Sequence, residues 1–235
     1  MDKKTAEKIL AQTESGYDLI AKKFAQTRKH FWREFDFIKE YVKPGDKVLD
    51  FGCGSGRLAA FLSETGGIDY VGADVSQALV DIARDNFKCE FVKLDPQSGK
   101  LPWAEGEFDA IFSIAVFHHF PSHAYRAQMA RELRRIVKKD GYVIVTVWNL
   151  WQPKYFQNIF KNWRAKLWGK SQLDWNDCQI SFTDNQGRKF ERFHHAFGKR
   201  ELRKLFSRAG FRVEKCEIVK GRNMVLVAKK EEDEV

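Results

Sequence analysis

The chain has 235 residues, and its 41 Lys and Arg outnumber its 32 Asp and Glu, which gives a formal charge of +9. Its 43% of hydrophobic residues suffice for a sizeable core and exclude wholesale disorder. No apolar run approaches the roughly 20 residues of a membrane span. The four cysteines lie far apart, which argues against a disulfide scaffold and against a zinc site, so we expect no metal. No signal peptide is recognisable, and we expect a cytoplasmic protein.

Apolar periodicity and turn residues divide the chain into alternating helices and strands. Helices are expected at residues 5–43, 57–64, 76–86, 122–137 and 199–209. Strands are expected at residues 47–51, 70–74, 90–94, 108–114, 142–147, 211–219 and 223–228. Asp140-Gly141 is expected to form the turn before the fifth strand.

This alternation predicts an α/β fold with a mostly parallel sheet and helices on both faces. The short Gly221-Arg222 connection leaves no room for a crossover helix, so the last two strands should pair antiparallel at one edge. We expect a single domain over residues 1–235, with an N-terminal helical extension at 1–43. Residues 149–198 are too aromatic to be disordered and are expected to form an inserted cap.

A glycine-rich turn follows the first strand and provides the strongest chemical signal. Gly52, Gly54 and Gly56 would let a ligand approach the backbone at the start of a helix. Asp74 ends the second strand, where its carboxylate can accept hydrogen bonds from a ribose diol. Arg57 stands where the dinucleotide fingerprint requires glycine, and no phosphate-binding P-loop motif is present. A nucleoside-containing cofactor other than a dinucleotide is therefore expected.

The segment Val48–Gly56 resembles the first motif of class I S-adenosylmethionine-dependent methyltransferases, and Asp74 resembles their ribose-binding acidic residue. Other matching positions extend the resemblance over about residues 45–148: Asp95, Leu101-Pro102-Trp103 and Glu107–Ile111. The resemblance implies a Rossmann-like fold and S-adenosyl-L-methionine as cofactor. Asp95 would contact the adenine amino group, although a turn role before Pro96 is the alternative. Tyr17 would cover the cofactor or belong to the core. The implied cofactor-binding residues are Tyr17, Asp50, Gly52, Cys53, Gly54, Gly56, Asp74, Val75, Asp95 and Ser113.

Four further segments resemble the tRNA wobble-uridine methyltransferases, which esterify a 5-carboxymethyl group on the uridine. They are Tyr17–Arg28, Ser113–Phe120, Val147-Trp148 and Arg192–Leu202. The chain departs from that family at Phe193-His194, where the family has an aromatic pair with tyrosine, and after Arg28, where the usual Pro-Trp-Pro is missing. The resemblance implies a tRNA substrate and a small zinc-binding activator subunit.

A carboxylate acceptor is already ionised at neutral pH, so it needs cations and hydrogen-bond donors to hold it and no general base. The candidates for this role are Arg28, His118, His119, Arg192 and His195. If the acceptor is instead a phenol or an alcohol, His118 or His119 is the natural base. The fourth strand ends in Ser-Ile-Ala-Val, without the Asn/Asp-Pro-Pro-aromatic signature of exocyclic amine methylation.

The cap concentrates basic and aromatic residues in a chain that already holds 20 Phe, 7 Trp and 6 Tyr. Between Trp151 and Lys170 there is no Asp or Glu. Apolar residues at 156, 160, 163 and 167 recur at helical spacing, which predicts a helix that packs them on the domain. Alternatively, its cations and exposed aromatics contact RNA, or the helix lies on a membrane surface.

Two other functions remain open at this point. The first is a methyltransferase for a small molecule or a lipid precursor, which an apolar pocket without cationic groups would favour. The second is a noncatalytic RNA-binding protein with a methyltransferase-like fold, which would not bind S-adenosylmethionine.

Overall fold

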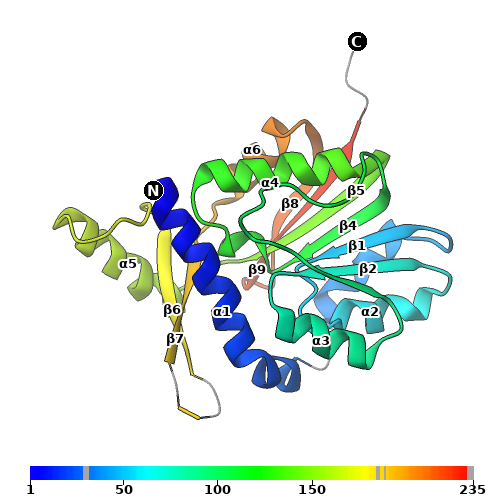
Figure 1. Cartoon of the computed structure of the whole chain (residues 1–235). Coiled ribbons are helices and arrows are strands. Elements are labelled where there is room, and N and C mark those ends of the chain that lie inside the picture. Colours follow the sequence, from blue (N-terminus) through cyan, green and yellow to red (C-terminus); the bar gives the residue numbers. More distant parts are fainter. Residues whose placement is uncertain (29–31, 184–185, 188, 232–235) are drawn as a thin grey trace.

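The computed structural model describes residues 1–28, 32–183, 186–187 and 189–231. Its main element is a seven-stranded sheet in the order β3-β2-β1-β4-β5-β9-β8 (Figure 1). Strands β1 to β5 of this sheet are parallel, whereas β9 pairs antiparallel with both β5 and β8, which confirms the expected architecture. The strands are β1 (Lys47–Phe51), β2 (Asp69–Asp74), β3 (Glu90–Lys93), β4 (Phe108–Ile114), β5 (Val137–Trp148), β8 (Phe211–Val219) and β9 (Asn223–Lys230).

Helices cover both faces of the sheet. Leu49 of β1 packs with residues of α4 and α6, whereas its neighbour Val48 packs with residues of α2, α3 and η1. The two side chains separate because successive residues of a strand point to opposite faces. The α-helices are α1 (Lys3–Thr27), α2 (Arg57–Leu62), α3 (Gln77–Asn86), α4 (His123–Ile136), α5 (Pro153–Leu167) and α6 (Lys199–Arg208). The 3-10 helices are η1 (Arg33–Tyr41), η2 (Ser63–Thr65) and η3 (Phe117–His119).

The N-terminal stretch is not the single helix expected over residues 5–43. Helix α1 ends at Thr27, and the second helical stretch is the 3-10 helix η1. The apolar residues Phe35, Ile38 and Tyr41 recur every three residues, which matches the three-residue turn of a 3-10 helix, although the same spacing also fits an α-helix. Residues 29–31 of the expected helix lie outside the described residues.

Asp140-Gly141 does not separate a helix from a strand, because β5 already begins at Val137. Asp140 has a φ of 61°, and the register against β4 shifts between Phe108 and Ala110. Between these pairs β4 advances from Phe108 to Ala110 while β5 advances from Val137 to Tyr142, so β5 holds extra residues that accommodate the turn-like Asp140 within the strand. The turn conformation expected at Asp140 is therefore present, but it lies within strand β5 and not before it.

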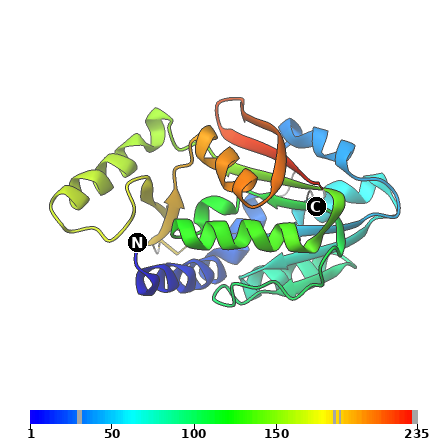
Figure 2. The ribbon, with the colours of Figure 1, turned by 90° about the horizontal axis from the view of Figure 1, so that it is seen from above.

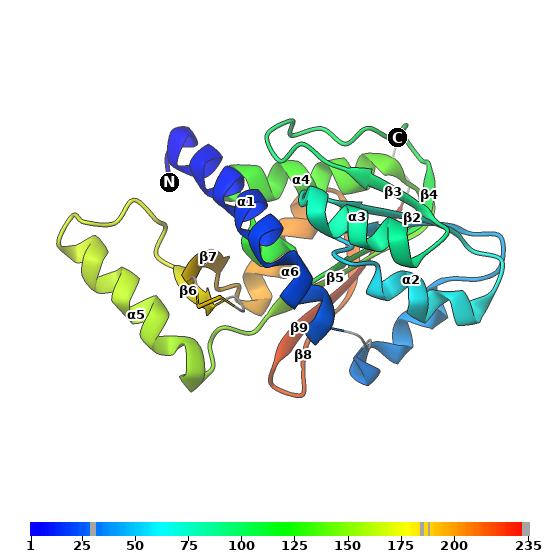
Figure 3. The ribbon, with the colours of Figure 1, turned by 60° about the horizontal axis from the view of Figure 1, so that its bottom comes forward.

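The stretch 149–198, expected to form a cap, contains α5 and a two-stranded hairpin of β6 (Asp177–Thr183) and β7 (Lys189–His195). Seen from above, α5 lies at the end of the molecule opposite to α2 (Figure 2). The hairpin lies between α5 and α1 (Figure 3). No helix among the described residues is both long enough and apolar enough to cross a membrane.

Helix α1 crosses the sheet near the carboxyl ends of its strands and contacts both α3 and the hairpin (Figure 1). Gly16 makes the hairpin contact possible, because a Cβ at this position would lie only 1.7 Å from the Phe190 ring of β7. On the other side, Asp18 accepts hydrogen bonds from the Ser76 hydroxyl at 2.6 Å and from the Ala78 amide at 3.1 Å. Helix α1 is thereby fixed between the hairpin and the start of α3.

Candidate active site

A pocket opens at the carboxyl ends of β1, β2 and β4, where ligands bind in open α/β sheets. Its floor is the turn between β1 and α2, and one wall is the inner face of α1. The α1 side chains in the wall are Leu10, Thr13, Tyr17, Phe24 and Arg28, whose spacing places them on one helix face. Trp148 at the end of β5 and Arg192 of β7 complete the opposite side.

The floor of the pocket depends on glycines with left-handed backbone conformations. Gly52 has a φ of 87°, and a Cβ there would lie 2.2 Å from a methyl group of Val116. The amides of Gly52 and Cys53 both donate to the Ala73 carbonyl, at 2.7 and 3.0 Å, which ties the turn to the end of β2. Only glycine gives this conformation and this close approach without strain.

Asp74 is held by the glycine turn and by the start of α3. One carboxylate oxygen accepts the Gly54 amide at 2.8 Å, and the other accepts the Ser76 amide at 2.9 Å. Burial raises the pKa of Asp74, while these backbone hydrogen bonds act in the opposite direction. A carboxylate has about four acceptor positions, so Asp74 retains capacity to accept a hydroxyl donor from a ligand in the pocket.

Of the ten expected cofactor-binding residues, six line this pocket: Tyr17, Gly52, Cys53, Gly54, Asp74 and Val75. Gly56 lies just outside the lining, at the N-cap of α2, with a φ of 82°. Asp50 is buried below the turn and accepts the Tyr70 hydroxyl at 2.7 Å. Its burial raises the pKa of Asp50 to about 7.

The remaining two expected cofactor residues also lie outside the lining. Asp95 is exposed and accepts the Gln97 amide at 2.8 Å, as in the turn role that the sequence left open. Its neighbours Leu94 and Pro96 do line the pocket. Ser113 is fully buried in β4, and its hydroxyl has no hydrogen-bond partner among the described residues.

His119 lies at the side of the pocket that α1 and the hairpin form, and two hydrogen bonds fix it there. Its Nδ1 lies 3.0 Å from the Phe193 carbonyl, which only accepts, so Nδ1 carries the proton. Its Nε2 therefore accepts the Tyr17 hydroxyl at 2.8 Å. Burial, assisted by the charge of Arg192, lowers the pKa of His119 to about 3. This imidazole is neutral at physiological pH.

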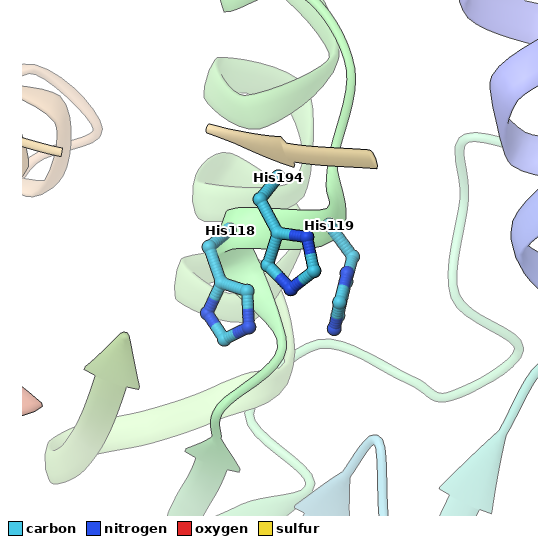
Figure 4. Close-up of side chains that lie close together, drawn as sticks. All are labelled: His118, His119 and His194. Atoms are coloured by element: carbon cyan, nitrogen blue, oxygen red, sulfur yellow. The ribbon is translucent and has the colours of Figure 1, made fainter. Parts of the chain in front are cut away.

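His118, His119 and His194 form a buried cluster beside the pocket (Figure 4). The rings of His118 and His194 stack with centroids 5.2 Å apart, and Trp148 stacks on His194 at the same distance. Burial lowers the pKa of both His118 and His194 well below its usual range. Their Nε2 atoms have no hydrogen-bond partner among the described residues.

The ring nitrogens of this cluster lie within 4.8 Å of one another, which is close enough to consider a metal ion. Two features oppose that assignment. The Nε2 of His119 is already paired with Tyr17, and the positive charge of Arg192 contributes to the low pKa values of all three imidazoles. The Arg192 guanidinium therefore repels a divalent cation at this place.

Two guanidinium groups from distant segments meet at the pocket. Arg192 of β7 is buried, with its charge 5.6 Å from the Trp148 ring centroid, and its Nε has no hydrogen-bond partner among the described residues. Arg28, at the end of α1, lies 4.2 Å above the Phe24 ring. Burial lowers its pKa, and the charge of Arg192 adds to this shift. Both guanidinium groups thus lie in a pocket from which water is partly excluded.

His195, expected at the acceptor site, lies elsewhere. Its Nδ1 is 2.6 Å from Asp177 and its Nε2 is 2.7 Å from Glu201, so both ring nitrogens are engaged by carboxylates. Burial favours the neutral ring, but these two hydrogen bonds outweigh it and the pKa of His195 is raised. The residue joins the hairpin to α6. His118 also lies outside the pocket lining and supports His119 from behind.

Trp148 lines the pocket, although the sequence analysis did not select it as a site residue. Its position directly after the β-branched run of β5 is the signal that identifies it, because strand ends form the site in this architecture. Phe24 was likewise missed. It lies on the same face of α1 as Tyr17 and Arg28, seven residues after the former and four before the latter.

Comparisons with known proteins agree with this geometry. Residues 49–145 match the family model described as a methyltransferase domain. A tRNA (carboxymethyluridine(34)-5-O)-methyltransferase of Arabidopsis thaliana is 36% identical over 132 residues, which are 56% of this chain and 31% of that protein. The chain thus spans about a third of the length of this curated relative.

Two solved structures share the fold. A S-adenosylmethionine-dependent methyltransferase of Methanosarcina mazei superposes with a TM-score of 0.71 at 18% identity, over 87% of this chain and all of the other. A Haloferax volcanii complex of a methyltransferase activator and a putative methyltransferase gives 0.63 at 18% identity, over 95% and 99%. The sheet order, the glycine turn and the two superpositions give the chain the class I methyltransferase fold, and its residues 49–145 match a methyltransferase domain. Within that class, its sequence is similar to the tRNA wobble-uridine methyltransferases.

Proposed function

We propose that the chain transfers a methyl group from S-adenosyl-L-methionine to a carboxylate and forms a methyl ester. We further propose that this carboxylate is the 5-carboxymethyl group of a wobble uridine in tRNA. The observation that carries the proposal is the chemistry of the acceptor half, where two guanidinium groups and a phenol meet at a neutral histidine.

The glycine turn and Asp74 fit the proposed cofactor. Gly52 and Gly54 leave the floor open where side chains would block it, and Asp74 retains capacity to accept a hydroxyl of a ribose diol. When bound, S-adenosylmethionine supplies an electrophilic methyl group on a sulfonium centre. The chain itself holds the nucleoside through Asp74 and covers it with Tyr17 and Phe24 of α1.

The side of the pocket that holds Arg28, His119 and Arg192 contains no good general base among the described residues. A base works best when its pKa lies near the working pH, but the pKa of His119 is about 3. His118, behind it, also has a strongly lowered pKa, whereas burial raises that of Tyr17 and Cys53. Among its described residues, this side therefore lacks a group that could deprotonate a phenol or an alcohol, whereas a carboxylate acceptor is already ionised and needs no such step.

The work of the chain is then to bind and orient the acceptor. Arg28 and Arg192 can hold a carboxylate through charge-assisted hydrogen bonds, and in a partly dry pocket these are stronger than in water. In the transfer, one carboxylate oxygen forms a bond to the methyl carbon while the bond from carbon to sulfur breaks, and no proton is transferred. Tyr17 and His119 fix the wall against which the acceptor lies.

The two cationic side chains also bear on the alternative functions. A small apolar or lipid-precursor acceptor offers no anionic partner for the half-buried Arg28 or for the buried Arg192. A noncatalytic RNA-binding role gives no reason for Asp74 to be held by two backbone amides at the pocket. Both alternatives therefore account for less of the site than carboxylate methylation does.

The tRNA part of the proposal is supported by the similarity to the Arabidopsis relative and by the charge of +9. The Haloferax neighbour was solved with a methyltransferase activator. We infer that this chain likewise works with a small activator subunit, which the family resemblance suggests is a zinc-binding protein.

The test uses an anticodon stem–loop RNA that carries 5-carboxymethyluridine, with the same RNA carrying uridine as control. Labelled S-adenosylmethionine is added with and without the activator, and nucleosides are analysed by mass spectrometry. We expect label only as the methyl ester in the first RNA. Label in both RNAs, or none although the cofactor binds, would overturn the substrate assignment. Arg28→Lys and Arg192→Lys keep the charge but lose bidentate binding, so each should lower turnover more than cofactor affinity.

A further inference from the structure

Helix α5 does not bury most of the apolar positions that its spacing predicts. Its buried side chains are Ile159, which packs with Cys178 of the hairpin, and Asn162, which donates to the Asp174 carbonyl at 2.8 Å. Asn158 also donates to the Gln179 carbonyl of the hairpin at 2.8 Å. Phe156 and Phe160 are 45% and 48% exposed. The expected packing is thus wrong for Phe156, Phe160 and Leu167, which are exposed, whereas Trp163 is partly buried and packs beside Ile159 as expected.

The outward surface of α5, comprising Phe156, Phe160, Lys161, Arg164, Leu167, Trp168 and Lys170, combines flat rings with cations. Phe156 and Phe160 stack with centroids 6.3 Å apart and an interplanar angle of 15°. Trp168 is 77% exposed. A groove on this surface is lined by Phe160 and Trp168 together with Lys161, Arg164 and Lys170. Aromatic rings and cations therefore alternate along a single groove.

The cations of the groove are available for a ligand. The described residues include no ion pair with Lys161, Arg164 or Lys170, and no acidic residue occurs between Trp151 and Lys170. Such a set suits a polymer that offers a phosphate and a flat base at each step. A helix on a membrane separates its apolar face from its basic face, whereas here Trp168 lies among the cations.

We propose that the outward surface of α5 binds single-stranded or loop RNA, with phosphates on its cations and bases on Phe160 and Trp168. The inference rests on the proposed function only for the identity of this RNA as tRNA. The hairpin connects the two places, because β6 contacts α5 while β7 carries Arg192 into the pocket. RNA held on α5 is thereby presented to the acceptor half of the site.

The test compares two charge-matched triple variants. Lys161→Gln/Arg164→Gln/Lys170→Gln alters the groove, whereas Arg131→Gln/Lys204→Gln/Arg208→Gln removes three exposed charges from α4 and α6. Binding of a fluorescent, unmodified anticodon stem–loop RNA is measured by anisotropy over a range of salt concentrations. We expect the groove variant to bind at least about tenfold more weakly and its salt slope to fall by about two, while the control variant changes little. Equal losses in the two variants would overturn the proposal.

Trp168→Ala provides a second measurement that leaves the charge unchanged. Loss of one stacked base should weaken RNA binding by about 5- to 150-fold, with cofactor affinity by calorimetry and thermal unfolding unchanged. Vesicles of phosphatidylserine are the competing ligand. If the groove variant loses vesicle binding but retains RNA binding, the surface is a membrane site and the proposal fails. RNA binding through α5 without methylation would instead refute the proposed function alone.

Discussion

The hydroxyl of Tyr17 donates a hydrogen bond to the Nε2 of His119 across 2.8 Å, and this bond joins α1 to η3 at the wall of the pocket. Tyr17→Phe removes the donor and leaves a buried ring nitrogen without a partner. We expect the free energy of unfolding in urea to fall by about 1–3 kcal/mol. Tyr155→Phe is the matched control, because the described contacts of Tyr155 use only its ring, and it should change stability little. A similar loss in both variants would contradict this role.

The Asp74 carboxylate both holds the glycine turn and faces the pocket. Asp74→Ala should therefore abolish cofactor binding in calorimetry. Asp95→Ala removes a carboxylate of the same type that is exposed and outside the pocket lining. Its cofactor affinity should stay within about threefold of the parent, since surface substitutions change free energies by only about 0.5 kcal/mol. Unchanged affinity in the Asp74 variant would exclude the cofactor assignment.

The buried Asp50 should make the folded state less stable as the pH rises. Its pKa of about 7 exceeds the ordinary value of 3.8, so the unfolded chain loses the proton first between these values. Asp50→Asn removes this titration. In urea unfolding, the variant should gain stability relative to the parent as the pH increases from 5 to 7. A difference that stays constant over this range would show that Asp50 is ionised in the folded state.

His195 should stabilise the contact between the hairpin and α6 as an imidazolium. Its raised pKa means that the contribution is complete below about pH 6.5 and is lost as the pH rises through the folded-state value. His195→Ala leaves the buried Asp177 unpaired and should cost about 3–5 kcal/mol at pH 6, measured by denaturant unfolding. Cofactor affinity of the folded variant should be retained. If the variant loses cofactor binding but keeps its stability, His195 contributes to the active site and not to the contact between the hairpin and α6.

Methyl transfer to a carboxylate should not follow the titration of a histidine. The pKa of His119 is about 3 and that of His118 is also lowered, so both rings are neutral from pH 6 to pH 8. We expect kcat with saturating RNA to be flat over this range, measured in the Asp50→Asn variant to remove the carboxyl titration near pH 7. A rising limb near pH 6.5 would identify a histidine base and point to a phenol or alcohol acceptor.

The sheet and the glycine turn could be predicted from sequence because their signals are local. The bounds expected for the strands at 108–114 and 211–219 match β4 and β8, and the turn after β1 follows from its glycines. The hairpin of β6 and β7 was not foreseen, although Cys178, Ile180 and Phe182 alternate with polar residues in β6, because the charged and aromatic residues of β7 lack such an alternation. For α5, periodicity locates an apolar face but does not reveal that the hairpin covers the neighbouring face around Ile159 and leaves Phe156 and Phe160 exposed.

The acceptor half of the site was predicted in part, for a related reason. Arg28, His119 and Arg192 were selected by resemblance, but their meeting at one pocket depends on how α1 and the hairpin pack. His195 follows His194 directly in β7, and successive strand residues point in opposite directions. One therefore joins the cluster beside the pocket while the other faces Asp177 and Glu201. No pattern in the sequence indicates which of the two points inward.

The Phe190 ring of β7 fills the space that a side chain at position 16 would occupy. Helix α1 and the hairpin, which form two walls of the pocket, are therefore packed tightly against each other. Withdrawal of α1 alone would pull the helix off the Phe190 ring and expose both surfaces to water. Under the proposed function, entry of the acceptor and release of the spent cofactor would therefore require α1 and the hairpin to move together. A bulkier residue at position 16 would break this contact between α1 and the hairpin without altering any residue that lines the pocket.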